Sequence, residues 1–121
     1  MAAKPFGFPV EHRLRTPADY KRVFSNPVKV SDRYFTVLAT SSPASQSRLG
    51  LAIAKKSIKK AVERNRIKRT VRESFRQQQI INNRDIVVLA RSDAAKATAS
   101  NLRASLERHW LELANRCDSC S

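Results

Sequence analysis

The residues best suited to chemistry in this sequence are cationic and are crowded into one short segment. Residues 55–76 contain ten lysines and arginines against two acids, Glu63 and Glu73, which gives a net charge of +8 in 22 residues. Guanidinium and ammonium groups neutralise phosphates, and like charges three or four positions apart on a helix repel one another. The segment therefore predicts a surface for a polyanion rather than an ordinary solvated face.

Side chains that could break bonds are few and scattered. His12 lies near the start and His109 near the end of the chain, so an acid/base pair between them is not expected. The acidic residues form no paired carboxylates and accompany no nucleophile motif. Cys117 and Cys120 form one C-x-x-C with no second pair to complete a zinc site, so we expect two exposed thiols rather than a metal or redox centre.

The composition of the whole chain points the same way. The 121 residues carry a net charge of +14, and 41% of them are hydrophobic, which predicts one folded domain over residues 1–121 with flexible ends at about 1–12 and 116–121. No apolar stretch approaches the roughly 20 residues of a membrane-spanning helix, and no signal-peptide segment precedes the domain. A cytoplasmic protein with a nucleic-acid partner and no membrane partner is expected.

Hydrophobic spacing predicts the elements of the first half. A short helix begins at Thr16-Pro17, carries Tyr20, Val23 and Phe24 on one face, and ends before Asn26-Pro27. One strand is expected over 28–40, and a hairpin-type loop over 41–47 leads into a second strand over 49–54. The second strand alternates bulky residues with small ones at positions 50, 52 and 54, which leaves room for a close neighbour or a ligand.

The second half contains the cationic segment. Ile67, Val71 and Phe75 recur at helical spacing, so a helix over about 60–79 would turn an apolar face to the core and a cationic face outward. Arg64 falls near the apolar stripe, which indicates either a partly covered stem or an irregular first turn. A buried strand over 85–91 and a last helix over about 98–115 follow.

These elements predict an α+β sandwich in the order α-β-β-α-β-α. The connection from the strand at 49–54 to the strand at 85–91 is too long for a hairpin, so at least one strand pair should be parallel. The small central sheet would carry the helices and position the cationic one.

Four stretches together resemble the bacterial ribonuclease P protein family. The first, similar to the family's RNR signature, is Glu63-Arg64-Asn65-Arg66-Ile67-Lys68-Arg69 followed by Arg72-Glu73-Ser74-Phe75-Arg76. The others are Phe8-Pro9 with Arg13-Leu14, Asp19-Tyr20-Lys21-Arg22-Val23-Phe24, and Arg48-Leu49-Gly50-Leu51-Ala52-Ile53-Ala54-Lys55-Lys56. The resemblance spans roughly residues 8–113, and the RNR run just after the GLxxxKK stretch is its most specific part.

The resemblance implies a fold and a function. The fold would be of the ribosomal S5 domain 2-like type, with a β-α-β crossover of the rare left-handed kind. The chain would be the protein subunit of a ribonucleoprotein that removes the 5′ leader of precursor tRNA by endonucleolytic cleavage. The RNA subunit would contain the catalytic centre and hold the magnesium, and no small-molecule substrate would be involved.

The resemblance also implies which residues touch RNA. Contact with the catalytic RNA would fall on Arg64, Asn65, Arg66, Lys68, Arg69 and Arg72. The leader would lie in a cleft between the first helix and the open sheet face, lined by Tyr20, Phe24, Phe35, Arg13, Arg33, Lys55 and Lys56. Aromatic faces beside cations suit a single strand bound with little sequence preference, although plain core packing is the alternative for each ring.

Two other functions account for part of the sequence. A structural RNA-binding protein of ribosomal type would explain the charge but not the set of motifs. A nuclease made of protein alone would need a cluster of carboxylates or histidines, and the sequence offers none.

Overall fold

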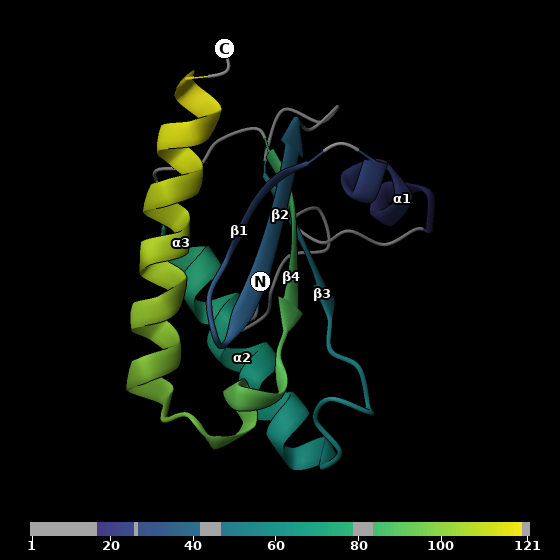
Figure 1. The fold of residues 1–121 in the computed structure, drawn as a ribbon, viewed down its shortest axis with the longest axis vertical. Coiled ribbons are helices and arrows are strands. Elements are labelled where there is room, and N and C mark those ends of the chain that lie inside the picture. Colours follow the sequence, from purple (N-terminus) through teal and green to yellow (C-terminus); the bar gives the residue numbers. More distant parts are fainter. Residues whose placement is uncertain (1–16, 26, 42–46, 79–83, 120–121) are drawn as a thin grey trace, which may run out of the picture.

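The computed structural model describes residues 17–25, 27–41, 47–78 and 84–119. Their elements follow in the order α1 (Pro17–Ser25), β1 (Val28–Ser31), β2 (Phe35–Ser41), β3 (Arg48–Ala52), α2 (Ala61–Gln77), β4 (Arg84–Ala90), the short 3₁₀ helix η2 (Ser92–Lys96) and α3 (Ala99–Ser119). Figure 1 shows α1 separated from α2 and α3 by the strands. The arrangement confirms the predicted single-domain α+β class.

The four strands form one mixed sheet in the order β1-β2-β4-β3. β3 and β4 are parallel neighbours, which confirms the pairing expected for the long connection through α2. β2 pairs with β4 in the antiparallel direction, so β4 lies between β2 and β3. The predicted hairpin-type connection over 41–47 is therefore wrong, because the strands on either side of that segment are not neighbours.

The strand predicted over 28–40 is in fact two strands. β1 and β2 form an antiparallel pair, and the chain reverses at Asp32. The carboxylate of Asp32 accepts hydrogen bonds from the backbone N–H groups of Tyr34 at 2.8 Å and Phe35 at 2.9 Å. An aspartate that binds backbone groups two and three residues ahead favours a turn over an extended strand, and this competing bond overrides the apolar alternation.

Two faces of the sheet are covered differently. The core face carries the main apolar cluster, in which α2 and α3 meet the strands, and it includes the fully buried Phe35, Ile86 and Trp110. The Trp110 indole donates to Ser74 Oγ at 2.8 Å and meets Phe75 edge to face, with ring centroids 6.0 Å apart. These contacts join α3 to α2.

The other face, here called the α1 face, carries a much smaller apolar cluster. Val23 of α1 packs there against Leu38 and Val87, with Tyr20 and Leu89 at the margin. Tyr20 packs against the side of β3 that carries small residues. A Cβ added at Gly50 would lie 2.7 Å from the tyrosine ring. The room predicted beside β3 is therefore occupied by α1 itself.

The helices begin and end close to their predicted positions. α1 ends at Ser25, before Asn26-Pro27, and α2 is two or three residues shorter than expected. α3 continues beyond residue 115 to Ser119, and η2 was not predicted. The expectations for residues 1–12, for Arg13 and for Cys120 lie outside the described residues.

Candidate RNA interface

The outer side of α2 carries the cationic stripe that its sequence predicts. Ile67, Val71 and Phe75 are at most 5% exposed and attach the helix to the core. The cationic stripe on the opposite side consists of the exposed Asn65, Arg69 and Arg76 and the half-buried Arg72. These positions follow one another at spacings of three and four residues, so their side chains project from one side of the helix.

Arg64 and Arg66 differ from the stripe because their guanidinium groups bind backbone carbonyls. Arg64 Nη1 donates to the carbonyl oxygens of Ile58 at 2.9 Å and Lys59 at 2.8 Å, which ties the first turn of α2 to the segment before it. The two terminal nitrogens of Arg66 donate to Ala97 O at 3.2 Å and Ala95 O at 3.1 Å. Both arginines thus hold the helix in place, and the prediction of a partly covered stem for Arg64 is correct.

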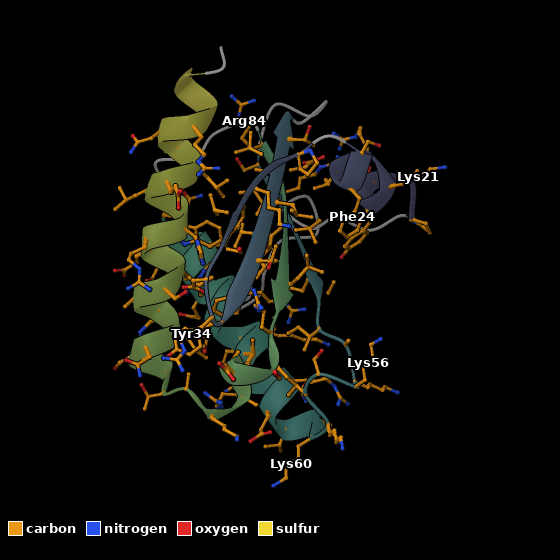
Figure 2. The ribbon with its side chains drawn as sticks, viewed as in Figure 1. Lys21, Phe24, Tyr34, Lys56, Lys60 and Arg84 are labelled. Atoms are coloured by element: carbon orange, nitrogen blue, oxygen red, sulfur yellow. The ribbon has the colours of Figure 1, made fainter. Side chains whose placement is uncertain are left out.

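More lysines extend the cationic surface beyond the N-terminal end of α2. Lys55 and Lys56 are exposed in the turn after β3, and Lys59 and Lys60 are exposed just before α2 begins. Figure 2 shows Lys56 and Lys60 at the end of the molecule where α2 starts. The surface therefore runs without interruption by acid from the end of β3 into the first turn of α2, where Glu63 is the first acidic residue.

The two aromatic residues predicted on α1 have different surroundings. Tyr20 is half-buried against Gly50, so most of its ring belongs to the contact between α1 and the sheet. Phe24 is 46% exposed, which is unusual for so large an apolar side chain and leaves a ring face free to stack. Lys21, three residues earlier, is also exposed, and Figure 2 shows it beside Phe24 on α1.

Phe35 does not line the α1 face. Its ring is 0% exposed and belongs to the core cluster beneath α2 and α3, so the core alternative holds for this residue. Successive side chains of a strand point to opposite faces, and Phe35 shares the core face of β2 with Val37, opposite to Leu38. The prediction that Phe35 contacts the leader is therefore wrong.

Arg33 is also separated from the α1 aromatics. It lies in the turn between β1 and β2, pairs with Asp93 at 3.7 Å and covers the ring of Tyr34 at 5.6 Å. Figure 2 shows Tyr34 far from both Phe24 and Lys56. The structure thus brings Phe24 and Lys21 to one end of β3 and Lys55 and Lys56 to the other, without Arg33.

A buried network of charges connects α1 to the sheet, and sequence reasoning missed it. Asp85 is 0% exposed, and Arg48 and Arg22 both pair with its carboxylate. The signal was present, since Arg48 and Asp19 both stand in the stretches that resemble the family. Sequence spacing predicts that the two strands are parallel but not their register, and the register is what sets Arg48 opposite Asp85.

Among the described residues, His109 and the carboxylate nearest to it lie outside α2. His109 is 4% exposed in α3, with Nε2 at 3.4 Å from Asp32 Oδ2, away from the cationic stripe. Burial would raise the pKa of Asp32, but hydrogen bonds from Ser105 and from the backbone of Phe35 and Tyr34 outweigh it and lower the pKa to about 2. In the part of the chain that the structure describes, no three histidine, cysteine or acidic side chains are grouped to hold a metal ion. No described helix is long and apolar enough to cross a membrane.

Comparison with known proteins decides between the RNA-binding classes. The sequence model of the ribonuclease P family matches residues 8–114. The chain belongs to the ribonuclease P protein family. It is 46% identical to the ribonuclease P protein component of Methylococcus capsulatus, over 96% of this chain and 91% of the relative, and 46% identical to that of Nitrosococcus oceani, over 94% and 97%.

Solved ribonuclease P proteins share the fold as well. The Staphylococcus aureus RNase P protein superposes with a TM-score of 0.76 at 35% identity, covering 85% of this chain and 94% of that one. The Thermotoga maritima protein, solved with 1-(4-fluorophenyl)-2-thiourea, gives 0.74 at 32% identity, covering 81% and 96%. The chain is therefore a ribonuclease P protein subunit with an RNA partner, and the ribosomal-type alternative is not needed.

Proposed function

We propose that this subunit binds the catalytic RNA through α2 and the 5′ leader of precursor tRNA along α1 and β3, and thereby assists removal of the leader. The observation that carries the proposal is the outward cationic stripe on α2 in a member of this family. The inner side of α2 is buried in the core, so the helix is already ordered before RNA binds. Little backbone entropy is therefore lost when its charges contact the RNA backbone.

The contact with the catalytic RNA divides between two kinds of residue. Asn65, Arg69 and Arg72 meet the RNA directly, and Lys68 stands at the margin of the same surface. Arg64 and Arg66 set the position of the helix through backbone carbonyls and offer only their remaining N–H groups to phosphate.

The leader would follow the edge of the α1 face. Phe24 provides a stacking surface, Lys21 stands beside it, and Lys55 and Lys56 bind phosphates beyond the far end of β3. Stacking on an aromatic ring tolerates any base, which suits a subunit that meets many leader sequences.

The chemical step is assigned to the RNA partner. A magnesium ion held by that RNA would activate water for hydrolysis of the phosphodiester bond. The protein would neutralise phosphate charge and hold the leader, which strengthens binding of both the substrate and the metal-loaded RNA. We place this activity in the cytoplasm.

Reconstitution with the RNA partner at low magnesium tests the proposal. The complex should cleave a precursor at its mature 5′ end faster than the RNA alone, and the advantage should shrink as magnesium rises and screens the phosphates itself. Cleavage by the protein without RNA, or no stimulation at any magnesium concentration, would contradict it. Ribosomal RNA as the main species bound in cells would instead favour a structural role.

A further inference from the structure

Among the residues that the structure describes, helix α1 contacts the sheet through little apolar surface. It has nine residues, too few to be stable alone in water, and only Val23 is fully buried. Apolar contact is not directional, so one buried valine and one half-buried tyrosine would allow the helix to rotate or slide on the sheet. Something else must fix its orientation.

Four charged side chains between α1 and the sheet provide directional contacts. Arg48 of β3 donates twice to the carboxylate of Asp85, from Nε to Oδ1 at 2.9 Å and from Nη2 to Oδ2 at 2.7 Å. The two residues are direct partners in the parallel register of β3 and β4. The strands thus hold one guanidinium in a fixed plane.

The same guanidinium reaches the helix. Arg48 Nη2 lies 3.4 Å from Asp19 Oδ1, and Arg22, one turn later on α1, pairs with Asp85 Oδ2. Two residues three positions apart on α1 are therefore held by two partners on neighbouring strands. Two such points fix both the position of the helix along the sheet and its rotation about its own axis.

We propose that Arg48 and Asp85 are positioning residues for the leader, because they set where α1 presents Phe24 and Lys21. This inference rests on the proposed leader function. Buried ion pairs often add little net stability, since desolvation offsets much of the attraction, but their geometry can select one arrangement over others. Here the arrangement selected is that of an exposed aromatic ring relative to the lysines after β3.

The guanidinium of Arg48 has the geometry that is needed to join α1 to β4. A planar guanidinium offers several fixed N–H groups and can meet both oxygens of Asp85 while it also reaches Asp19. A lysine ammonium has three donors on a single nitrogen and lacks the planar fork that meets both oxygens of Asp85. Replacement by methionine keeps an unbranched stem and removes every N–H group.

The test compares binding of precursor tRNA with binding of mature tRNA by the reconstituted complex. Arg48→Met should weaken precursor binding about tenfold, the order of one lost base-stacking contact, and leave mature tRNA binding unchanged. Arg48→Lys should give an intermediate loss. The single-turnover cleavage rate at saturating precursor should stay near that of the original protein, because the RNA performs the chemistry.

A matched variant separates positioning from stability. Ile86 neighbours Asp85 on β4 but is buried on the core face, so Ile86→Val destabilises the protein without touching the network. It should lower the melting temperature and keep the preference for precursor. If Arg48→Met unfolds the protein, Asp19→Asn weakens the contact of Arg48 with α1 and leaves the pair of Arg22 with Asp85 in place, and it should still reduce the preference.

The possible results lead to distinct conclusions. Equal losses for precursor and mature tRNA in Arg48→Met, or an unchanged preference in both Arg48→Met and Asp19→Asn, would overturn the positioning role. A wild-type complex with no preference for precursor would instead overturn the proposed leader function. A reduced preference in the Arg48 and Asp19 variants, with none in Ile86→Val, supports both.

Discussion

The two faces of the sheet hold α2 and α1 by different means. On the core face, seventeen buried residues form one cluster that fixes α2, so its cationic stripe stands on a rigid base. On the α1 face the buried cluster has three of the described residues, and ion pairs complete the attachment. Hydrophobic burial is strong and non-directional, whereas paired charges are weak in net energy and directional. Burial of apolar surface thus holds α2 on the sheet, whereas directional ion pairs orient α1.

The largest expected effect is a difference in the free energy of unfolding between variants of two phenylalanines, Phe35 and Phe24. Phe35→Ala should lower the free energy of unfolding by about 3–5 kcal/mol, because it opens a cavity in the core cluster. Phe24→Ala should cost less than about 1 kcal/mol, because half of that side chain is already exposed. Urea denaturation of both variants measures the difference. Similar losses would mean that the α1 face is as tightly packed as the core face.

A second test concerns Asp32, which links the β1–β2 turn to α3. Its pKa of about 2 lies below the ordinary 3.8, so its charged form stabilises the fold above about pH 4, and this contribution is lost as the pH falls towards 2. The loss should be about 2 kcal/mol. Denaturation between pH 5 and pH 2 should show it in the original protein and not in Asp32→Asn.

The control for this test is Asp93→Asn. Asp93 is exposed and pairs only loosely with Arg33, at 3.7 Å, so its replacement should keep the pH dependence of the original protein. A pH dependence that survives in Asp32→Asn would assign the effect to other carboxylates.

A third test addresses the exposed ring on α1. Phe24→Ala should weaken binding of precursor tRNA by about 1–3 kcal/mol and leave mature tRNA binding unchanged, because only the leader would stack on the ring. Competition binding with the two tRNAs measures this difference. Leu111→Ala is the matched control, since it removes another exposed apolar side chain from the outer side of α3. Equal effects of the two substitutions would exclude a specific role for Phe24.

Most helices and the cationic stripe could be predicted from the sequence because they depend on local spacing. Ile67, Val71 and Phe75 define the inner side of α2 whatever lies beneath it, and Pro17 and Asn26-Pro27 mark the limits of α1. The features that local spacing does not predict depend on contacts between segments that are far apart in the sequence. The register of β3 and β4 places Arg48 beside Asp85, and no local pattern contains that information.

Two errors concern the segment around β2. The turn at Asp32 does not follow from the apolar alternation, which continues through it, because the deciding bonds run from the Asp32 carboxylate to the backbone. Phe35 and Leu38 are three positions apart on β2 and therefore point to opposite faces, so Phe35 packs in the core cluster while Leu38 packs under α1. Arg64 and Arg66 were likewise grouped with Arg69, since a helical wheel shows direction but not the carbonyls that a side chain will meet.

The smallest expected effects distinguish Arg69 from Arg66. Arg69→Ala should reduce the slope of log affinity against log salt for the catalytic RNA by about 0.7–0.9, the value for one lost phosphate contact, and leave the free energy of unfolding within about 0.5 kcal/mol. Arg66→Ala should lower the free energy of unfolding by about 1 kcal/mol or more, because two backbone carbonyls lose their donor.

Salt titration and urea denaturation of the same two variants measure both effects, with Arg103→Ala on α3 as an exposed control of equal charge change. The control should leave the slope and the stability unchanged, since general charge loss far from the interface does not release counterions there. An unchanged slope in Arg69→Ala would remove this residue from the contact with the catalytic RNA. An unchanged stability in Arg66→Ala would instead leave its guanidinium available for phosphate, and Arg66 would then be counted with the cationic stripe on α2.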